Sequence, residues 1–296
     1  MKPILFSVSY AGYWGQQALS LEEFIPRAAE LGYAGVELAT KRPHLSPLDW
    51  DDARLDELAH LCAGNGIEVE CLAGYTNFSG GMSSAEVPFV EMQIAYIETL
   101  ARMAARLGCP LVRTFTAYER DDVPPAQIWA TTVAAIRECC DRAAEHGVNI
   151  GIQNHHDIAV HTKALAFMLE EIDRPNCGLM FDAWSPCLRG EDAYETARAM
   201  APHTVHTTFA DYVRLPRAHY QPALVNYAAE PVDLVRAVPM GEGDLDNAGF
   251  LRGLRDGGYD GPVAYEMCSP VLGGGSIENL DHCARQFVAW LQEQVG

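Results

Sequence analysis

The apolar and polar positions of the chain repeat one sequence pattern. Each copy predicts a helix that ends in glycine and is followed directly by a short strand. The pattern is clear in AAELGYAGVELA (28–39), AARLGCPLVRTF (104–115) and AAEHGVNIGIQN (143–154), with further copies at 62–73 and 254–267. Glycine after a helix adopts the left-handed cap conformation without steric cost, so a strand begins directly. This repetition predicts alternating helices and strands, which is typical of α/β proteins with a parallel sheet.

The intervals between these copies complete a set of eight predicted strands. They lie at about 4–10, 34–39, 67–73, 110–116, 148–154, 177–183, 204–210 and 261–267. Several alternate bulky apolar residues with small ones and then a polar one, as Ile150 and Ile152 alternate with Gly151 and Gln153. The pattern favours a closed barrel with a polar mouth over an open sheet, whose two faces would both meet helices. We therefore predict a single-domain (β/α)8 TIM barrel over residues 1–296.

Three segments carry further structural signals. Residues 20–23 (SLEE) form a capping box that predicts the start of the first helix, and uninterrupted patterns predict helices over 90–107 and 277–294. Residues 211–243 break the rhythm with four prolines, three tyrosines and only a short helical pattern. Because this segment follows the seventh strand, where barrel active-site loops are found, we predict a lid or substrate loop.

The net charge and the composition of the chain limit the classes of binding partner that we expect. A formal net charge of −19 would repel both a nucleic-acid backbone and an anionic membrane surface, so we expect neither as a partner. Nine cysteines without a CxxC pair indicate reduced thiols, and no stretch approaches the roughly 18 apolar residues of a membrane span. These features predict a cytoplasmic protein.

Candidate chemistry collects at the predicted strand ends. The fifth strand finishes in Gln153 and His155, the sixth in Asp182, the seventh carries His206 and the eighth carries Glu266. Barrel enzymes place their active sites at this end of the strands. Oxygen and imidazole ligands around one point suit Mn²⁺, Mg²⁺ or Co²⁺, with Zn²⁺ as a further candidate. A metal held by Gln153, Asp182, His206 and Glu266 would polarise a substrate carbonyl and acidify the adjacent C–H.

A family resemblance appears in the same residues. Asn-His after the fifth strand, Asp at the end of the sixth, and MGEGDLDNAGFLRGLRDGGYDGPVAYE (240–266) resemble the xylose-isomerase-like barrels of sugar isomerases and epimerases, including the tagatose-epimerase and inosose-dehydratase types. The resemblance covers essentially the whole chain. It implies a divalent metal held by Glu, Asp, His and Glu on strands five to eight, proton shuttling by the two glutamates, a sugar substrate and a homo-oligomer.

Two positions depart from the family pattern, whereas Asp182 and Glu266 match it. Gln153 stands where the family has its first glutamate, and an amide has no basicity for proton abstraction. Thr208 stands where the family presents its metal-binding histidine, and His206 is the nearest imidazole. We therefore predict Glu266 as base and ligand, Gln153 as ligand or substrate hydrogen bond, and His155 as acid or fourth ligand.

Five residues are predicted on the substrate side. Glu37 resembles a substrate-side carboxylate of the family, with a buried partner for Arg113 as the alternative. Trp184 offers a flat face to a sugar ring, Arg217 is a candidate for holding substrate oxygens, and His156 adjoins the catalytic imidazole.

Three functions remain open at this point. The first is a metal-dependent isomerase or epimerase of a sugar or keto-sugar that works through an enediolate. The second is a keto-sugar dehydratase or hydratase of the same superfamily, which the exchange of a glutamate for Gln153 beside histidines would suit. The third is a non-catalytic carbohydrate-binding barrel, for which Gln153 and Thr208 are the evidence.

Overall fold

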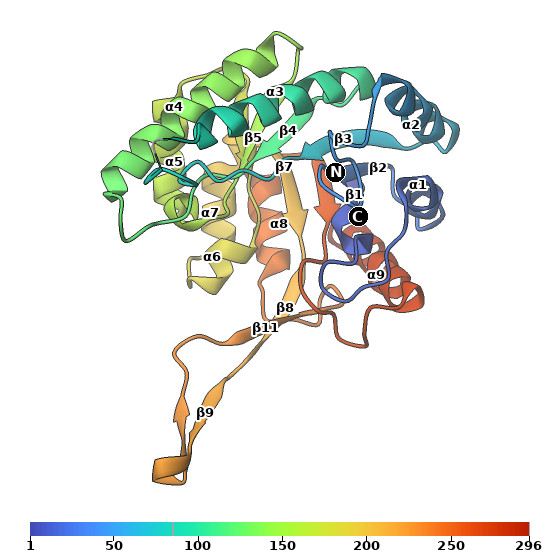
Figure 1. Cartoon of the computed structure of the whole chain (residues 1–296). Helices are drawn as coiled ribbons and strands as arrows, with labels where there is room; N and C mark the ends of the chain where they lie inside the picture. Colours follow the sequence, from blue (N-terminus) through green and yellow to red (C-terminus); the bar gives the residue numbers. More distant parts are fainter. Residues whose placement is uncertain (85, 296) are drawn as a thin grey trace.

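The computed structural model describes residues 1–84 and 86–295, and its centre is a closed barrel of eight parallel strands (Figure 1). Around the barrel the order is β1-β12-β7-β6-β5-β4-β3-β2. The strands are β1 (Lys2–Phe6), β2 (Gly35–Ala39), β3 (Glu68–Ala73), β4 (Leu111–Thr114), β5 (Asn149–Gln153), β6 (Cys177–Met180), β7 (Thr204–Phe209) and β12 (Pro262–Tyr265). The predicted (β/α)8 barrel is confirmed.

Helices surround the barrel between successive strands (Figure 1). They are α1 (Leu21–Glu30), α2 (Asp52–Gly64), α3 (Phe89–Leu107), α4 (Pro125–Ala144), α5 (Thr162–Ile172), α6 (Trp184–Leu188), α7 (Ala193–Met200), α8 (Asn247–Asp256) and α9 (Ile277–Val295). The predicted capping box is present, because Ser20 accepts from the Glu23 amide while the Glu23 carboxylate accepts from the Ser20 amide. No helix in the described part of the chain is both long and apolar enough to cross a membrane.

All eight predicted strands exist, but most end earlier than predicted. The largest difference is at the first, where Ser7–Tyr10 forms a 3₁₀ turn instead of continuing the strand. The side chains of Ser7 and Ser9 each accept a backbone N–H from a neighbouring segment, at Ala39 and Met267. The chain thus leaves the barrel wall early, and its polar side chains take over the hydrogen bonding.

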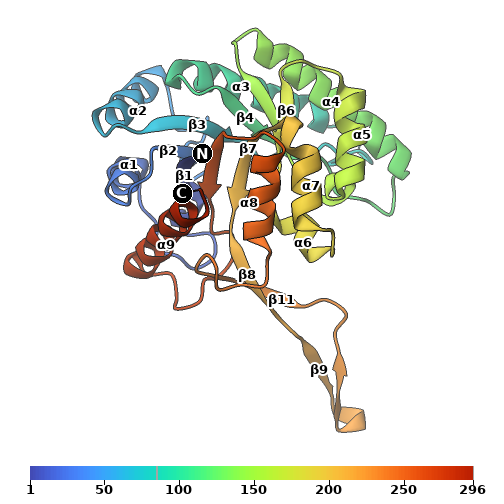
Figure 2. The ribbon, with the colours of Figure 1, turned by 180° about the vertical axis from the view of Figure 1, so that it is seen from behind.

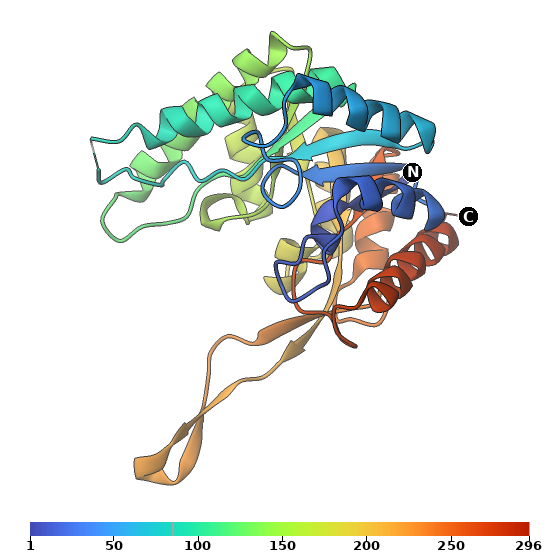
Figure 3. The ribbon, with the colours of Figure 1, turned by 45° about the vertical axis from the view of Figure 1, so that its right-hand side comes forward.

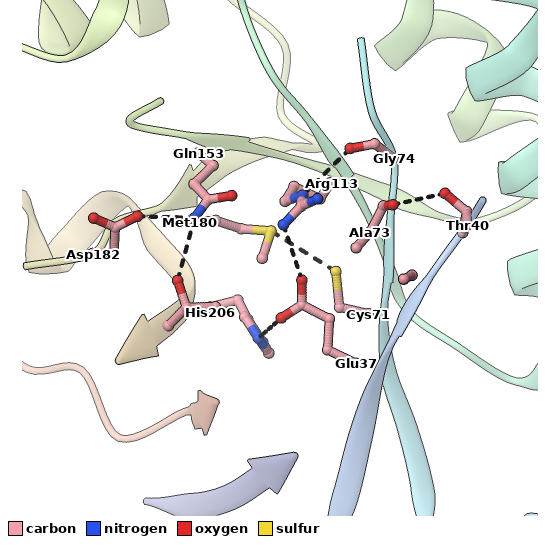
Figure 4. Close-up of polar contacts among 12 residues, drawn as sticks. Glu37, Thr40, Cys71, Ala73, Gly74, Arg113, Gln153, Met180, Asp182 and His206 are labelled. Carbon is pink, nitrogen blue, oxygen red and sulfur yellow. Dashed lines mark hydrogen bonds and ion pairs between the residues drawn. The ribbon is translucent and has the colours of Figure 1, made fainter. Parts of the chain in front are cut away.

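Side chains from several strands meet inside the barrel, among them Glu37, Cys71, Arg113 and Met180 (Figure 4). Cys71, Leu111 and Met180 form a small apolar cluster inside the barrel. Gly151 provides room for this cluster, since a Cβ there would lie 2.7 Å from Cγ of Met180. A second, polar layer contains Glu37 and Arg113, and the cavity described below lies toward the carboxyl ends of the strands.

Residues 211–238 form an antiparallel arm of four strands. The prediction for this segment was a loop with a short helical pattern, and the structure corrects it. The arm contains β8 (Asp211–Leu215) paired with β11 (Leu234–Val238), and β9 (Ala218–Gln221) paired with β10 (Asn226–Ala229). It extends away from the barrel in every view (Figures 1, 2 and 3). The prolines that masked the strands lie between or after them, at 216, 222, 231 and 239, where no ladder hydrogen bond is lost.

The base of the arm is fastened to the barrel by Asp211. Its Oδ2 accepts backbone N–H groups from Gly241 and Gly243 at 2.9 and 3.0 Å, and its Oδ1 accepts from Tyr212. A Cβ on Gly243 would lie 2.0 Å from Oδ1 of Asp211, so only glycine allows this approach. The arm therefore starts from a fixed point beside the cavity, since Tyr212 lines it.

Candidate active site

A cavity of about 570 Å³ opens at the carboxyl ends of the barrel strands. Its floor carries polar side chains from β4 and β5 and from the segments after β6 and β12, whereas its walls are rich in aromatic rings. The lining residues are Phe6, Val8, Trp14, Lys41, Tyr75, Thr76, Asn77, Gln93, Arg113, Phe115, Tyr118, Gln153, His155, His156, Asp182, Trp184, Tyr212, Glu266 and Cys268. A polar floor under aromatic walls is the lining that a sugar-sized ligand with flat apolar faces requires.

Gln153 and Asp182 are joined at the floor by a direct hydrogen bond (Figure 4). Nε2 of Gln153 donates to Oδ2 of Asp182 at 2.9 Å and to the Thr208 hydroxyl at 3.3 Å. Oδ1 of Asp182 accepts from the Trp184 amide, and Asn154 hydrogen-bonds the Asp182 backbone in both directions. These contacts fix both side chains and leave the buried Oε1 of Gln153 without a protein partner.

Two carboxyl groups at the floor resist ionisation. Burial, and then the charges of Asp182 and Glu37, raise the pKa of Glu266 to about 8, although the charge of Arg113 acts in the opposite direction. Burial raises the pKa of Asp182 to about 6, against the hydrogen bond from Gln153. Glu266 is therefore a carboxyl group whose proton is exchanged close to neutral pH, which suits an acid–base catalyst.

Glu37 is absent from the cavity lining and contacts Arg113 and His206 instead (Figure 4). Its side chain is fully buried and contacts Nη1 of Arg113 at 3.5 Å and Nε2 of His206 at 3.1 Å. Of the two interpretations of Glu37, the structure shows the buried partner of Arg113. His206 is likewise fully buried and is held by Glu37 instead of joining Gln153, Asp182 and Glu266 around the cavity.

The two histidines after β5 pack into the aromatic wall. The His156 ring lies 4.0 Å from the Tyr118 ring and 4.6 Å from the Phe115 ring, measured between centroids. Burial, and then the nearby His155 and Arg113, lower the pKa of His156 to about 3, so this ring is neutral at pH 7. Nδ1 of His155 accepts the His156 backbone N–H, which places the ring proton of a neutral His155 on Nε2.

Of the remaining predicted site residues, Trp184 lies in the cavity and Arg217 lies on the arm. Trp184 lines the cavity and packs against Tyr212, with ring centroids 4.1 Å apart. Arg217 lies on the arm between β8 and β9, contacts the Val232 carbonyl and is absent from the cavity lining. Sequence reasoning missed Lys41 and Tyr75, whose only signal was their position just beyond the ends of β2 and β3.

Comparison with known families decides the classification. A family model described as xylose isomerase-like TIM barrel matches residues 25–294. The chain belongs to this family. The resemblance inferred from residues 240–266 and from the strand ends is thus confirmed.

Proteins similar to this chain include two 3-epimerases. A ketose 3-epimerase from Arthrobacter globiformis is 24% identical over 259 residues, which cover 83% of this chain and 76% of the relative. A fructoselysine 3-epimerase from Escherichia coli O157:H7 is 20% identical over 86% of this chain and 87% of the relative. Among solved structures, D-psicose 3-epimerase with D-tagatose from Clostridium cellulolyticum H10 has a TM-score of 0.74 and 17% identity, covering 100% of this chain and 99% of that one.

The family resemblance implied a metal, and the structure tests whether the predicted ligands fit one. They do not assemble the predicted four-ligand centre: His206 is occupied by Glu37, and Gln153 turns its Nε2 toward Asp182. Among residues 1–84 and 86–295, no three His, Cys, Asp or Glu side chains form a group suited to a metal ion. The physical reason is that Gln153 and Thr208 replace the carboxylate and imidazole that the resemblance required.

Proposed function

We propose that this family member is a sugar isomerase or epimerase that moves a proton at the carbon beside a ketose carbonyl, with Glu266 as the base. The observation that carries this proposal is the Glu266 carboxyl at the floor of the cavity, with a pKa of about 8. A base whose pKa lies close to the working pH is both available and strong enough to accept a proton from carbon. The names of the two curated relatives, both 3-epimerases of ketose-type sugars, support the same reaction class.

Gln153 favours a reaction that needs one proton-carrying carboxylate at the substrate carbon. In aldose–ketose isomerisation one base takes the proton and returns it to the neighbouring carbon on the same face. Epimerisation needs a second acid on the other face, and Gln153 has no ionisable proton to give. We therefore expect isomerisation to dominate, with any epimerisation drawing its second proton from Asp182 or His155.

Deuterium exchange tests the proposed function directly. The purified chain is incubated in D₂O with D-fructose, D-tagatose and D-psicose, and deuterium at the carbons beside the carbonyl is followed by NMR. We expect incorporation together with a new sugar of unchanged elemental composition. Loss of one water from the product would identify a dehydratase instead, and binding without any exchange would identify a carbohydrate-binding barrel.

We also propose that the homo-oligomer implied by the family resemblance forms through the arm, residues 211–238. A two-stranded hairpin alone is marginally stable in water, and this arm exposes large apolar side chains along its length. The most exposed are Leu224, Val225, Tyr227, Val232 and Leu234. The partner is a second copy of the chain, because the arm beyond Asp211 carries three arginines against two acidic residues whereas the whole chain has a net charge of −19.

The arm contact predicts a change in molecular mass. The variant Leu224→Ser/Val225→Asn removes the exposed apolar tip, and asparagine tolerates the left-handed backbone at Val225 (φ 46°). We expect light scattering to give a multiple of 32.4 kDa for the wild type and 32.4 kDa for the variant at micromolar concentration. A wild type that already elutes as one chain would refute the arm contact.

A further inference from the structure

Four buried polar atoms on residues that line the same cavity lack a partner within the protein. They are the Tyr75 hydroxyl, Nη2 of Arg113, Oε1 of Gln153 and Nδ1 of His156. Arg113 and Gln153 are each 2% exposed, so solvent cannot fully satisfy these atoms. Leaving a buried polar atom unpaired costs free energy, and a bound ligand or water that pairs with the atom recovers that cost.

Two of the three guanidinium nitrogens of Arg113 are engaged within the protein. Nε donates to the Gly74 carbonyl at 3.3 Å and Nη1 contacts Glu37 at 3.5 Å, which leaves Nη2 as the free arm of the guanidinium (Figure 4). The guanidinium carbon lies 4.4 Å from the Phe115 ring centroid and 4.8 Å from that of Tyr75. The faces of the Phe115 and Tyr75 rings therefore hold the guanidinium in place and keep water away from it.

Lys41, the other permanently charged basic side chain in the lining, stacks on aromatic rings, one of which it shares with Arg113. Its Nζ lies 3.8 Å above the Tyr75 ring centroid and 4.3 Å above that of Tyr13. Arg113, in contrast, lies close enough to Glu266 for its charge to affect that carboxyl group. The cavity therefore holds the Arg113 guanidinium near the Glu266 carboxyl, with Asp182 and Lys41 also in its lining.

From this arrangement we infer that Nη2 of Arg113 binds the carbonyl oxygen of the substrate and stabilises the negative charge that develops there, in the place that the family assigns to a metal. The inference rests on the proposed function. Glu266 carboxylate takes the proton from the carbon beside the carbonyl, and the C–H electron pair becomes the new C=C bond. The carbonyl π pair moves to oxygen, which becomes an enolate held by the guanidinium; no other reactant is consumed. The free Oε1 of Gln153 accepts a neighbouring substrate hydroxyl.

The test compares ligands that differ only at the carbonyl. Binding of D-fructose, D-tagatose and D-psicose, and of the alditols made by reducing each, is measured by calorimetry with EDTA present. We expect the wild type to prefer the ketose, and Arg113→Met to weaken ketose binding by about 10- to 100-fold while alditol binding is unchanged. Arg174→Met is the matched control, because Arg174 pairs with Asp141 on the surface, outside the cavity.

The outcomes separate this inference from the proposed function. Ketose preference in the wild type that is lost in Arg113→Met supports the inference, even where no deuterium exchange occurs and the proposed function fails. Preference that survives in Arg113→Met, or that appears in the wild type only when Mn²⁺ replaces EDTA, overturns it while leaving ketose chemistry intact. If Arg113→Met does not fold by circular dichroism, Arg113→Gln is used, since it retains a polar side chain without the charge.

Discussion

Glu266→Gln is expected to abolish proton exchange and, at the same time, to make the folded chain more stable at pH 8. Exchange beside the ketose carbonyl should fall by about 10²- to 10⁴-fold, the usual contribution of a general base. The free energy of unfolding at pH 8 should rise by about 4 kcal/mol, because an amide in this position never has to ionise inside the protein. Urea unfolding at several pH values provides the measurement.

The sign of the pH dependence follows from the raised pKa of Glu266. Its folded-state pKa of about 8 exceeds the ordinary 4.5, so the folded state holds a proton that the unfolded state releases. The associated stability is fully present below pH 4.5 and is lost progressively as the pH rises toward 8. Wild type and Glu266→Gln should thus have similar stability at pH 4.5 and diverge between pH 5 and 8. The rate of exchange by the wild type should rise over the same interval as the base loses its proton.

A suitable control changes the same residue type where it is exposed. Glu293→Gln in α9 should alter neither the exchange rate nor the pH dependence of stability, since its side chain lies on the surface. A bound divalent metal would reverse the prediction, because Glu266→Gln would then lose a ligand and a favourable charge interaction. Lower stability of Glu266→Gln at pH 8 would therefore argue against the carboxyl environment described above.

The sequence predicted the barrel because its evidence is local. Each copy of the helix–glycine–strand pattern is a short-range signal, and eight strands with small inward residues have few ways to close. Parity also placed Gln153 and Glu266 on the interior face, where both now line the cavity. The arm escaped prediction because its prolines suggested a loop, although they lie outside the paired strands.

The sequence predicts whether a strand side chain points into the barrel more readily than it predicts how deep in the barrel that side chain lies. Parity places Glu37 and His206 inside the barrel, but it does not reveal that both are absent from the cavity lining, nor that they bind each other. Their sequence separation of 169 residues means that only closure of the barrel brings β2 and β7 across from one another. The identity of a buried partner therefore depends on strand tilt and register, which no local pattern encodes.

This buried group predicts a large loss of stability in Glu37→Leu. The substitution leaves the Arg113 guanidinium, which is 2% exposed, without its carboxylate, and removes the acceptor of His206. Breaking a buried ion pair from one side typically costs about 3–5 kcal/mol, since the remaining charge stays desolvated. We expect a loss of that size in the free energy of unfolding, measured by urea titration at pH 7.

The double variant Glu37→Leu/Arg113→Met tests whether the stability lost in Glu37→Leu is due to the unpaired charge or to altered packing. It removes both charges together, and apolar replacement of a buried pair is often nearly neutral, so we expect most of the lost stability to return. The exposed pair of Glu98 and Arg142 supplies the control, and Glu98→Leu should change stability little. Equal losses in the single and double variants would assign the effect to packing. Recovery of stability in the double variant would mean that the barrel folds as well without either charge. That barrel would lack only the group proposed to hold the substrate oxygen. The role of Glu37 would then be chiefly to keep the Arg113 cation at the cavity floor.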